Sequence, residues 1–92
     1  MTKFEILVSE TARRQIEDLP ENLRKRVKSA LSVLSEDPYR PRPKADIKKL
    51  RGPTKNYFRL RIGEYRAIYV IEGNRVLVAK VLLRSKAYDW IE

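Results

Sequence analysis

The chain contains no cysteine and no histidine, and these two absences narrow the chemistry that it can perform. Without cysteine there is no disulfide bond and no thiolate nucleophile. Without histidine there is no imidazole for acid–base catalysis, and a metal site would have to consist of carboxylates alone. The sequence also lacks an apolar run long enough to cross a bilayer and a signal-peptide pattern at its N-terminus. We therefore expect a cytoplasmic protein with no membrane contact and no cofactor.

The charge is strongly positive for a chain of 92 residues. Lysine and arginine together number 21 and aspartate and glutamate 12, which gives a formal charge of +9. This length allows one domain, residues 1–92, with one small core. A basic balance in a small domain indicates polyanionic partners: nucleic acid, the ribosome or an acidic protein.

Most of that charge lies in one segment, between Arg40 and Arg66. The segment contains two acidic residues, Asp46 and Glu64. It contains ten basic ones: Arg40, Arg42, Lys44, Lys48, Lys49, Arg51, Lys55, Arg59, Arg61 and Arg66. The basic residues are therefore concentrated in a patch.

Hydrophobic periodicity predicts an α+β fold. We expect strands at 3–8, 57–62, 65–71 and 75–83, two helices between residues 9 and 36, and a short helix at 86–91. The segment 37–53, which is rich in proline, is expected to be a loop anchored to the core by Ile47 and Leu50. The two helices would form an α-hairpin on one face of a small antiparallel sheet, in the order β-α-α-β-β-β with a C-terminal helix.

The stretch from 56 to 71, N-Y-F-R-L-R-I-G-E-Y-R-A-I-Y-V-I, is the most informative part of the chain. It predicts two strands joined by Gly63-Glu64 in a type II′ turn. This register pairs Arg61 with Arg66 on one face of the sheet. Like charges directly opposite each other destabilise a sheet, so the pair indicates an anion site. Replacement of Arg66 with alanine should then leave stability unchanged or slightly raised.

Arg84, at the end of the last predicted strand, belongs to the same face only if the register is irregular. If Gly73-Asn74 is a two-residue turn, simple alternation places Arg84 on the face away from Arg66. Three arrangements would remove the conflict: a β-bulge, a three-residue loop, or a strand that ends at Leu83.

Three motifs together resemble the RelE/ParE toxin superfamily of bacterial and archaeal toxin–antitoxin systems. They are L-R-G at 50–52, Y-F-R-L-R-I-G-E-Y-R at 57–66 with Tyr69, and L-R at 83–84 with Tyr88. The middle motif is the most specific, because it combines alternation, a turn and paired arginines. The resemblance covers the whole chain in element order and length. It implies a compact toxin that is neutralised by an antitoxin wrapped around its surface.

The superfamily has two branches with different activities. In the RelE branch the toxin enters the ribosomal A site and cleaves mRNA there, whereas in the ParE branch it inhibits DNA gyrase and is not a nuclease. The RelE resemblance implies that four arginines bind the scissile phosphate and that one tyrosine orients a base: Arg59, Arg61, Arg66, Arg84 and Tyr88. This chain has arginine at the first two positions, where RelE nucleases often have lysine, and leucine at position 83, where many relatives have histidine. Both departures count against a role in proton transfer more than against a role in RNA binding.

Attack of an RNA 2′-hydroxyl on the adjacent phosphate needs a base, an acid and cations that stabilise the phosphorane. Arginines suit the last task, because a guanidinium donates two parallel hydrogen bonds to phosphate oxygens. They are poor bases, since a pKa above ~12 leaves almost no neutral form at pH 7. Lys55, Lys80 and Lys86 are the candidate bases, and catalysis by positioning alone is left open. RNA binding is also expected from these three lysines and from Lys48, Lys49 and Arg51.

The residues outside this set have simpler interpretations. Tyr65 and Tyr69 are expected in the core, and the basic run at 24–28 on a solvated helix face or against ribosomal RNA. The sequence thus predicts a type II toxin, a ribosome-dependent mRNA endoribonuclease that inhibits translation. Its expected partners are a cognate acidic antitoxin, mRNA and the ribosomal RNA of the A site. Two alternatives stand beside it: a toxin that inhibits gyrase, and an inactive module that binds RNA or acidic protein.

Overall fold

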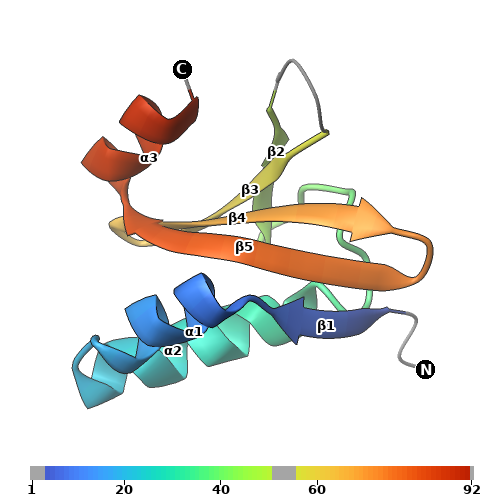
Figure 1. The fold of residues 1–92 in the computed structure, drawn as a ribbon. Helices are drawn as coiled ribbons and strands as arrows, with labels where there is room; N and C mark the ends of the chain where they lie inside the picture. Colours follow the sequence, from blue (N-terminus) through green and yellow to red (C-terminus); the bar gives the residue numbers. More distant parts are fainter. Residues whose placement is uncertain (1–3, 51–55, 92) are drawn as a thin grey trace.

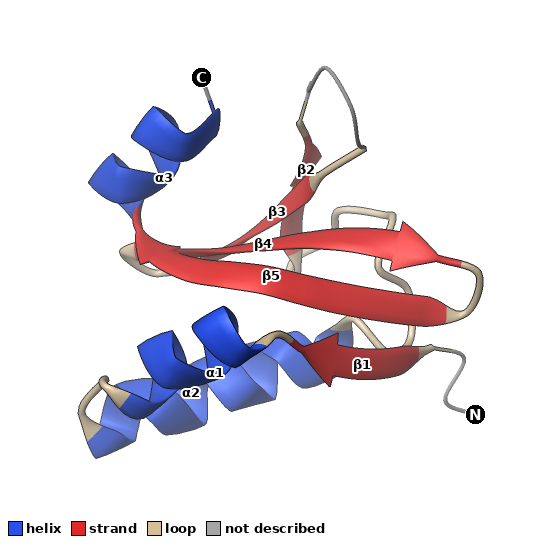
Figure 2. Ribbon diagram, in the orientation of Figure 1, coloured by secondary structure: helices blue, strands red, loops and turns tan. Residues whose placement is uncertain are grey.

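The computed structural model describes residues 4–50 and 56–91, with the backbone alone for 88–91. The elements follow in the order β1 (Glu5–Val8), α1 (Glu10–Glu17), α2 (Glu21–Val33), β2 (Asp46–Lys49), β3 (Phe58–Ile62), β4 (Tyr65–Glu72), β5 (Arg75–Leu83) and α3 (Arg84–Ile91). Figure 2 shows one twisted sheet with the α1–α2 hairpin on one side of it. The predicted α+β class and the predicted α-hairpin are confirmed.

The sheet is mixed, with the strand order β1-β5-β4-β3-β2. β3 and β4 pair in antiparallel fashion, as do β4 and β5, both as predicted, and β2 adds an antiparallel strand beside β3. β1, however, pairs with β5 in parallel, with Val8 opposite Val78. The prediction of a purely antiparallel sheet is therefore corrected at this edge. β1 leads into two helices and not into a tight turn, and a connection of that length allows parallel pairing.

The strand β2 lies inside the segment that the sequence predicts as a loop. It pairs with β3, so that Asp46 faces Arg61 and Lys48 faces Arg59. Ile47, between them, is buried in the core, as its predicted role as an anchor requires. The other predicted anchor, Leu50, is only partly buried and does not belong to the core cluster, so that prediction is wrong. With four residues and one apolar side chain, β2 has too little alternation to be recognised from its own sequence.

The helices and the sheet enclose one hydrophobic core. α1 and α2 cover one face of the sheet, and α3 lies on the other side, near one end of β4 and β5 (Figure 1). The core residues from the sheet are Ile47, Phe58, Leu60, Ile62, Ala67, Tyr69, Val76, Val78 and Val81, and those from the two helices include Ala12, Ile16, Val27 and Leu31. Among the described helices, none is long and apolar enough to cross a membrane.

The loop between α2 and β2 is held by buried polar contacts. The hydroxyl of Tyr69, which is fully buried, donates to the carbonyl of Pro38 at 2.7 Å. The guanidinium of Arg42 donates to the carbonyls of Asp37 at 2.9 Å and Val33 at 3.0 Å. Arg42 therefore fixes the loop to the end of α2, although it belongs to the basic segment of the sequence.

Candidate functional site

The β3–β4 hairpin has the predicted register. Ile62 faces Tyr65 and Arg61 faces Arg66. Gly63 has a φ of +61°, and no described residue other than glycine has a positive φ. A positive φ at the first of the two loop residues alone is the pattern of the predicted type II′ turn. The two arginines therefore lie side by side on one face of the sheet, the face opposite α1 and α2.

A β-bulge at Ala79 brings Arg84 to that same face. From the Gly73-Asn74 turn the pairing of β4 with β5 is regular up to Tyr69 and Val78, but Ile68 then pairs with Lys80. One residue of β5, Ala79, is thus skipped. Beyond the bulge Arg66 faces Leu82, and the amide of Arg84 donates to the carbonyl of Glu64 at 2.8 Å. Of the three arrangements that the sequence leaves open, two are confirmed: the bulge, and a strand that ends at Leu83, since α3 begins at Arg84.

These arginines line a pocket of about 320 Å³ on the open face of the sheet. The lining residues come from β2 and the residue after it, and from β3, β4 and α3: Asp46, Lys48, Leu50, Arg59, Arg61, Arg66, Arg84 and Ala87. Five of the eight carry a positive charge and one carries a negative charge. We call this set the arginine pocket. Cations from four separate elements line it, and such a group of cations can form strong hydrogen bonds with an anion.

Asp46 is the carboxylate of the arginine pocket, and sequence reasoning missed it. Its Oδ1 lies 3.3 Å from Nη1 of Arg59, and its Oδ2 lies 4.0 Å from Nη1 of Arg61. Its side chain is half exposed, whereas that of Arg59 is 19% exposed. The signal that could have identified Asp46 is the alternation of D-I-K around buried Ile47, which places Asp46 and Lys48 on one face.

Arg66 is more firmly built into the fold than the sequence suggests. Only 8% of the residue is exposed, and its Nη1 donates to the carbonyls of Gly63 and Tyr65, each at 2.9 Å. The guanidinium therefore braces the β3–β4 turn while it lines the arginine pocket. This reverses the expectation for Arg66→Ala: the substitution removes two charge-assisted hydrogen bonds as well as a like-charge neighbour.

The other predicted site residues are divided between several places. Lys48 lines the arginine pocket, but Lys49 follows it in β2 and lies on the other face. Lys80 is partly buried opposite Ile68, and Lys86 is exposed on α3; neither lines the pocket. Three expectations lie outside the described residues: Arg51, Lys55 and the side chain of Tyr88. The core positions of the other two tyrosines are as predicted, since Tyr69 is buried and Tyr65 packs against the core.

The arginine pocket is suited to bind and stabilise a negatively charged group rather than a metal ion. Among the described residues, no three acidic side chains are grouped where they could hold a metal ion. The guanidinium groups supply donors for the oxygens of a phosphate or phosphorane. Asp46 supplies an acceptor beside them, since an ionised carboxylate accepts protons and an arginine does not.

Comparison with known proteins gives a consistent result. Residues 6–88 match the family described as the ParE toxin of the type II toxin–antitoxin system parDE. Toxin RelE3 of Methanocaldococcus jannaschii is 30% identical over 87 residues, which cover 95% of this chain and 98% of that protein.

Two solved structures with 28% sequence identity have the same fold. One is the RelB–RelE antitoxin–toxin complex of Methanococcus jannaschii, with a TM-score of 0.72 over 94% of this chain and 99% of the other. The second is the toxin–antitoxin complex RelBE2 of Mycobacterium tuberculosis, with a TM-score of 0.75 over 89% of this chain and 99% of the other.

Proposed function

The chain belongs to the ParE toxin family of type II toxin–antitoxin systems, and on this premise we propose that it inhibits translation as a ribosome-dependent mRNA endoribonuclease. The observation that carries the proposal is the arginine pocket. A toxin that acted by surface contact alone would have no need to place Arg59, Arg66 and Arg84 around one cavity from separate elements. A scissile phosphodiester gains one negative charge as the 2′-oxygen attacks and the dianionic phosphorane forms, and preorganised guanidinium groups stabilise that charge.

In the proposed reaction the 2′-oxygen of the RNA attacks the adjacent phosphorus and the bond from phosphorus to the 5′-oxygen breaks. The carboxylate of Asp46 accepts the proton of the 2′-hydroxyl, since it is the one carboxylate among the described residues that line the pocket. Arg59, Arg61 and Arg84 hold the phosphate oxygens. We assign the proton taken up by the leaving 5′-oxygen to a water molecule.

We propose that cleavage depends on the ribosome because the pocket is open and offers few side chains for acid–base catalysis. Asp46 is half exposed and lies within ion-pair distance of two arginines, so part of its hydrogen-bonding capacity is already in use. Such a site depends on a substrate that arrives already aligned for in-line attack. The mRNA held in the ribosomal A site meets that condition, and its setting is the cytoplasm.

The test compares one mRNA free in solution and bound to programmed ribosomes. The purified toxin is added to each, and the new 5′ ends are mapped by primer extension. We expect cuts at the A-site codon of the ribosome-bound mRNA and very slow cutting of the free mRNA. Rapid, equal cutting of both would refute ribosome dependence, and no cutting of either would refute the nuclease proposal.

A cognate antitoxin is the second proposed partner. The two solved relatives are complexes of a toxin with an antitoxin, and this chain carries a formal charge of +9. We expect an acidic antitoxin that orders on binding, with an association rate that falls clearly between low and physiological salt. Tight binding of a neutral antitoxin at a rate insensitive to salt would show that charge does not guide recognition.

One observation favours inhibition of DNA gyrase instead: the matching family is named for the ParE toxin. In that case the arginine pocket would hold an acidic side chain of a protein target, and no bond would be broken. Inhibition of gyrase supercoiling at toxin concentrations that leave ribosome-bound mRNA intact would support this function.

A further inference from the structure

The bulge at Ala79 is held from outside the sheet by two side chains, one from the N-cap of α1 and one from its second turn. The hydroxyl of Ser9 donates to the carbonyl of Ala79 at 2.7 Å. The side-chain carbonyl of Gln15 accepts the amide proton of Val81 at 2.7 Å. Each contact joins residues more than 60 positions apart in the chain.

These contacts satisfy backbone groups that the sheet itself leaves without a partner strand. β1 covers the outer edge of β5 only as far as Val8 opposite Val78, and the amide of Ser9 adds one last ladder bond to the carbonyl of Val78 at 2.9 Å. Beyond that point the outer edge of β5 faces α1. A bulge also interrupts the ladder locally, so its carbonyl and amide groups need other partners.

Side-chain burial requires a bulge but does not fix its place. In a strand without a bulge, Val76, Val78 and Lys80 would share the face that packs on α1 and α2, and burial of Lys80 would be costly. A bulge anywhere between Val78 and Val81 avoids this, because it turns both valines toward the core, where they are found. The contacts of Ser9 and Gln15 select Ala79 among these positions.

The position of the bulge decides where Arg84 lies. The bulge sets the pairing of Arg66 with Leu82. This pairing in turn decides on which face of the sheet, and at which point along β4, the chain leaves β5 for α3. We infer that Ser9 and Gln15 are positioning residues: they lock the bulge and thereby hold Arg84 in the arginine pocket. The consequence for catalysis rests on the proposed function, whereas the effect on the register does not.

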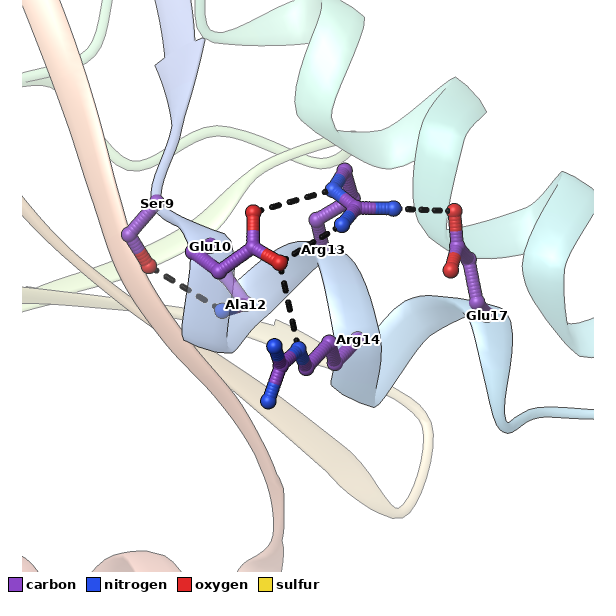
Figure 3. A network of polar contacts seen from close by, with 6 residues as sticks. All are labelled: Ser9, Glu10, Ala12, Arg13, Arg14 and Glu17. Atoms are coloured by element: carbon purple, nitrogen blue, oxygen red, sulfur yellow. Dashed lines mark hydrogen bonds and ion pairs between the residues drawn. The ribbon is translucent and has the colours of Figure 1, made fainter.

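Ser9 also caps α1, and this role must be separated from its contact with the bulge. Its hydroxyl oxygen accepts the amide of Ala12 at 3.0 Å while its proton goes to Ala79. Figure 3 shows the neighbouring network of Glu10 with Arg13 and Arg14, which stabilises the same helical turn on its exposed side. Glu10→Ala therefore weakens α1 without touching the bulge. Ser9→Asp keeps a capping acceptor but has no proton for the carbonyl of Ala79.

The experiment combines NMR on the free toxin with single-turnover cleavage on saturating programmed ribosomes. In Gln15→Leu we expect exchange of the Val81 amide to accelerate about 10-fold or more, and the cross-strand contacts of Arg66 with Leu82 to weaken. Gln15→Glu, which keeps an acceptor oxygen, should restore both. Glu10→Ala should change neither.

In the cleavage assay Gln15→Leu and Ser9→Asp should each lower the rate about 10-fold to 100-fold with unchanged affinity for the ribosome. Arg84→Ala should lower the cleavage rate by a much smaller factor in the Gln15→Leu background than in the wild type, because both changes act through the guanidinium of Arg84. Strictly additive effects of Gln15→Leu and Arg84→Ala would overturn the inference. So would unchanged Val81 exchange and unchanged Arg66–Leu82 contacts in the Ser9→Asp/Gln15→Leu double variant. If the wild type cleaves nothing, the proposed function fails, and the NMR measurements alone decide whether the two residues hold the bulge.

Discussion

Asp46 and Arg61 stand directly opposite each other on β2 and β3, and the carboxylate of Asp46 lies within ion-pair distance of both Arg59 and Arg61. The sequence shows two arginines paired across a hairpin and predicts an anion beside them. The structure supplies one anion from within the chain. A bound phosphate would therefore have to share these arginines with Asp46, and the exchange of partners would free the carboxylate to accept a proton.

Asp46→Asn separates binding from proton transfer. Loss of the negative charge should leave binding to programmed ribosomes unchanged or slightly tighter, because phosphate then meets no competing carboxylate. Single-turnover cleavage should fall about 10²-fold or more, as when a general base is removed. Rates are measured at saturating ribosomes, and affinity by filter binding with an mRNA that carries a 2′-deoxy nucleotide at the cut site. Full activity of Asp46→Asn would assign Asp46 a purely structural role as counter-ion.

Arg66→Ala should both unfold more easily and cleave more slowly. The two hydrogen bonds to the carbonyls of Gly63 and Tyr65 are charge-assisted, and their loss should lower stability by about 1–3 kcal/mol. Urea unfolding followed by circular dichroism measures this loss. Arg61→Ala is the matched control, since Arg61 is half exposed and lies opposite Arg66. A melting temperature for Arg66→Ala equal to or above that of the wild type would restore the like-charge interpretation.

Tyr69→Phe should affect stability and leave the chemistry intact. The substitution removes the donor to the buried carbonyl of Pro38, which should cost about 1–3 kcal/mol. The ring itself, stacked at 5.6 Å on Phe58, stays in place. The cleavage rate per folded molecule should equal that of the wild type at a temperature where both are folded. A specific loss of activity would mean that the loop between α2 and β2 takes part in the site.

Asp37 should make stability depend on pH at the acidic end. The amide of Tyr39, which donates to the carboxylate at 2.9 Å, holds the pKa of Asp37 below its ordinary value of 3.8. Because the folded-state pKa is the lower one, the stabilisation is present above about pH 4 and is lost as the pH falls through the folded-state pKa. The stability difference between the wild type and Asp37→Asn should shrink along that range in urea titrations. A difference that stays constant from pH 7 to pH 2.5 would contradict the assignment.

Local signals predicted the parts of the fold that depend on short-range geometry. A two-residue loop with glycine first fixes the register of its hairpin, so the pairing of Arg61 with Arg66 followed from a few residues. The direction of β1 could not follow in the same way, since the connection from β1 to its partner β5 runs through the rest of the chain. The strand β2 was missed because its partner, β3, supplies most of its stabilisation.

The four arginines of the candidate site were predicted from the hairpin and from the family resemblance, whereas the residues that only strand pairing brings to them were missed. Asp46 joins the arginines only through the pairing of β2 with β3. The place of the bulge was hidden because Leu77, Leu82 and Leu83 make β5 apolar on both faces, which removes the alternation that would reveal a change of phase. The residues that hold the bulge, Ser9 and Gln15, come from the opposite end of the chain.

The most direct test of the central claim, that the arginine pocket cleaves RNA through its 2′-hydroxyl, examines the ends of the products. Programmed ribosomes are cut with the wild type, with Arg84→Ala and with the exposed helix control Lys25→Ala, on mRNA with either ribose or 2′-deoxyribose at the mapped cut site. We expect 2′,3′-cyclic phosphate and 5′-hydroxyl ends from the wild type, a rate about 10²-fold lower for Arg84→Ala, wild-type behaviour of Lys25→Ala, and no cut in the deoxy-substituted mRNA. Cleavage of the deoxy-substituted mRNA, or full activity of Arg84→Ala, would contradict the account.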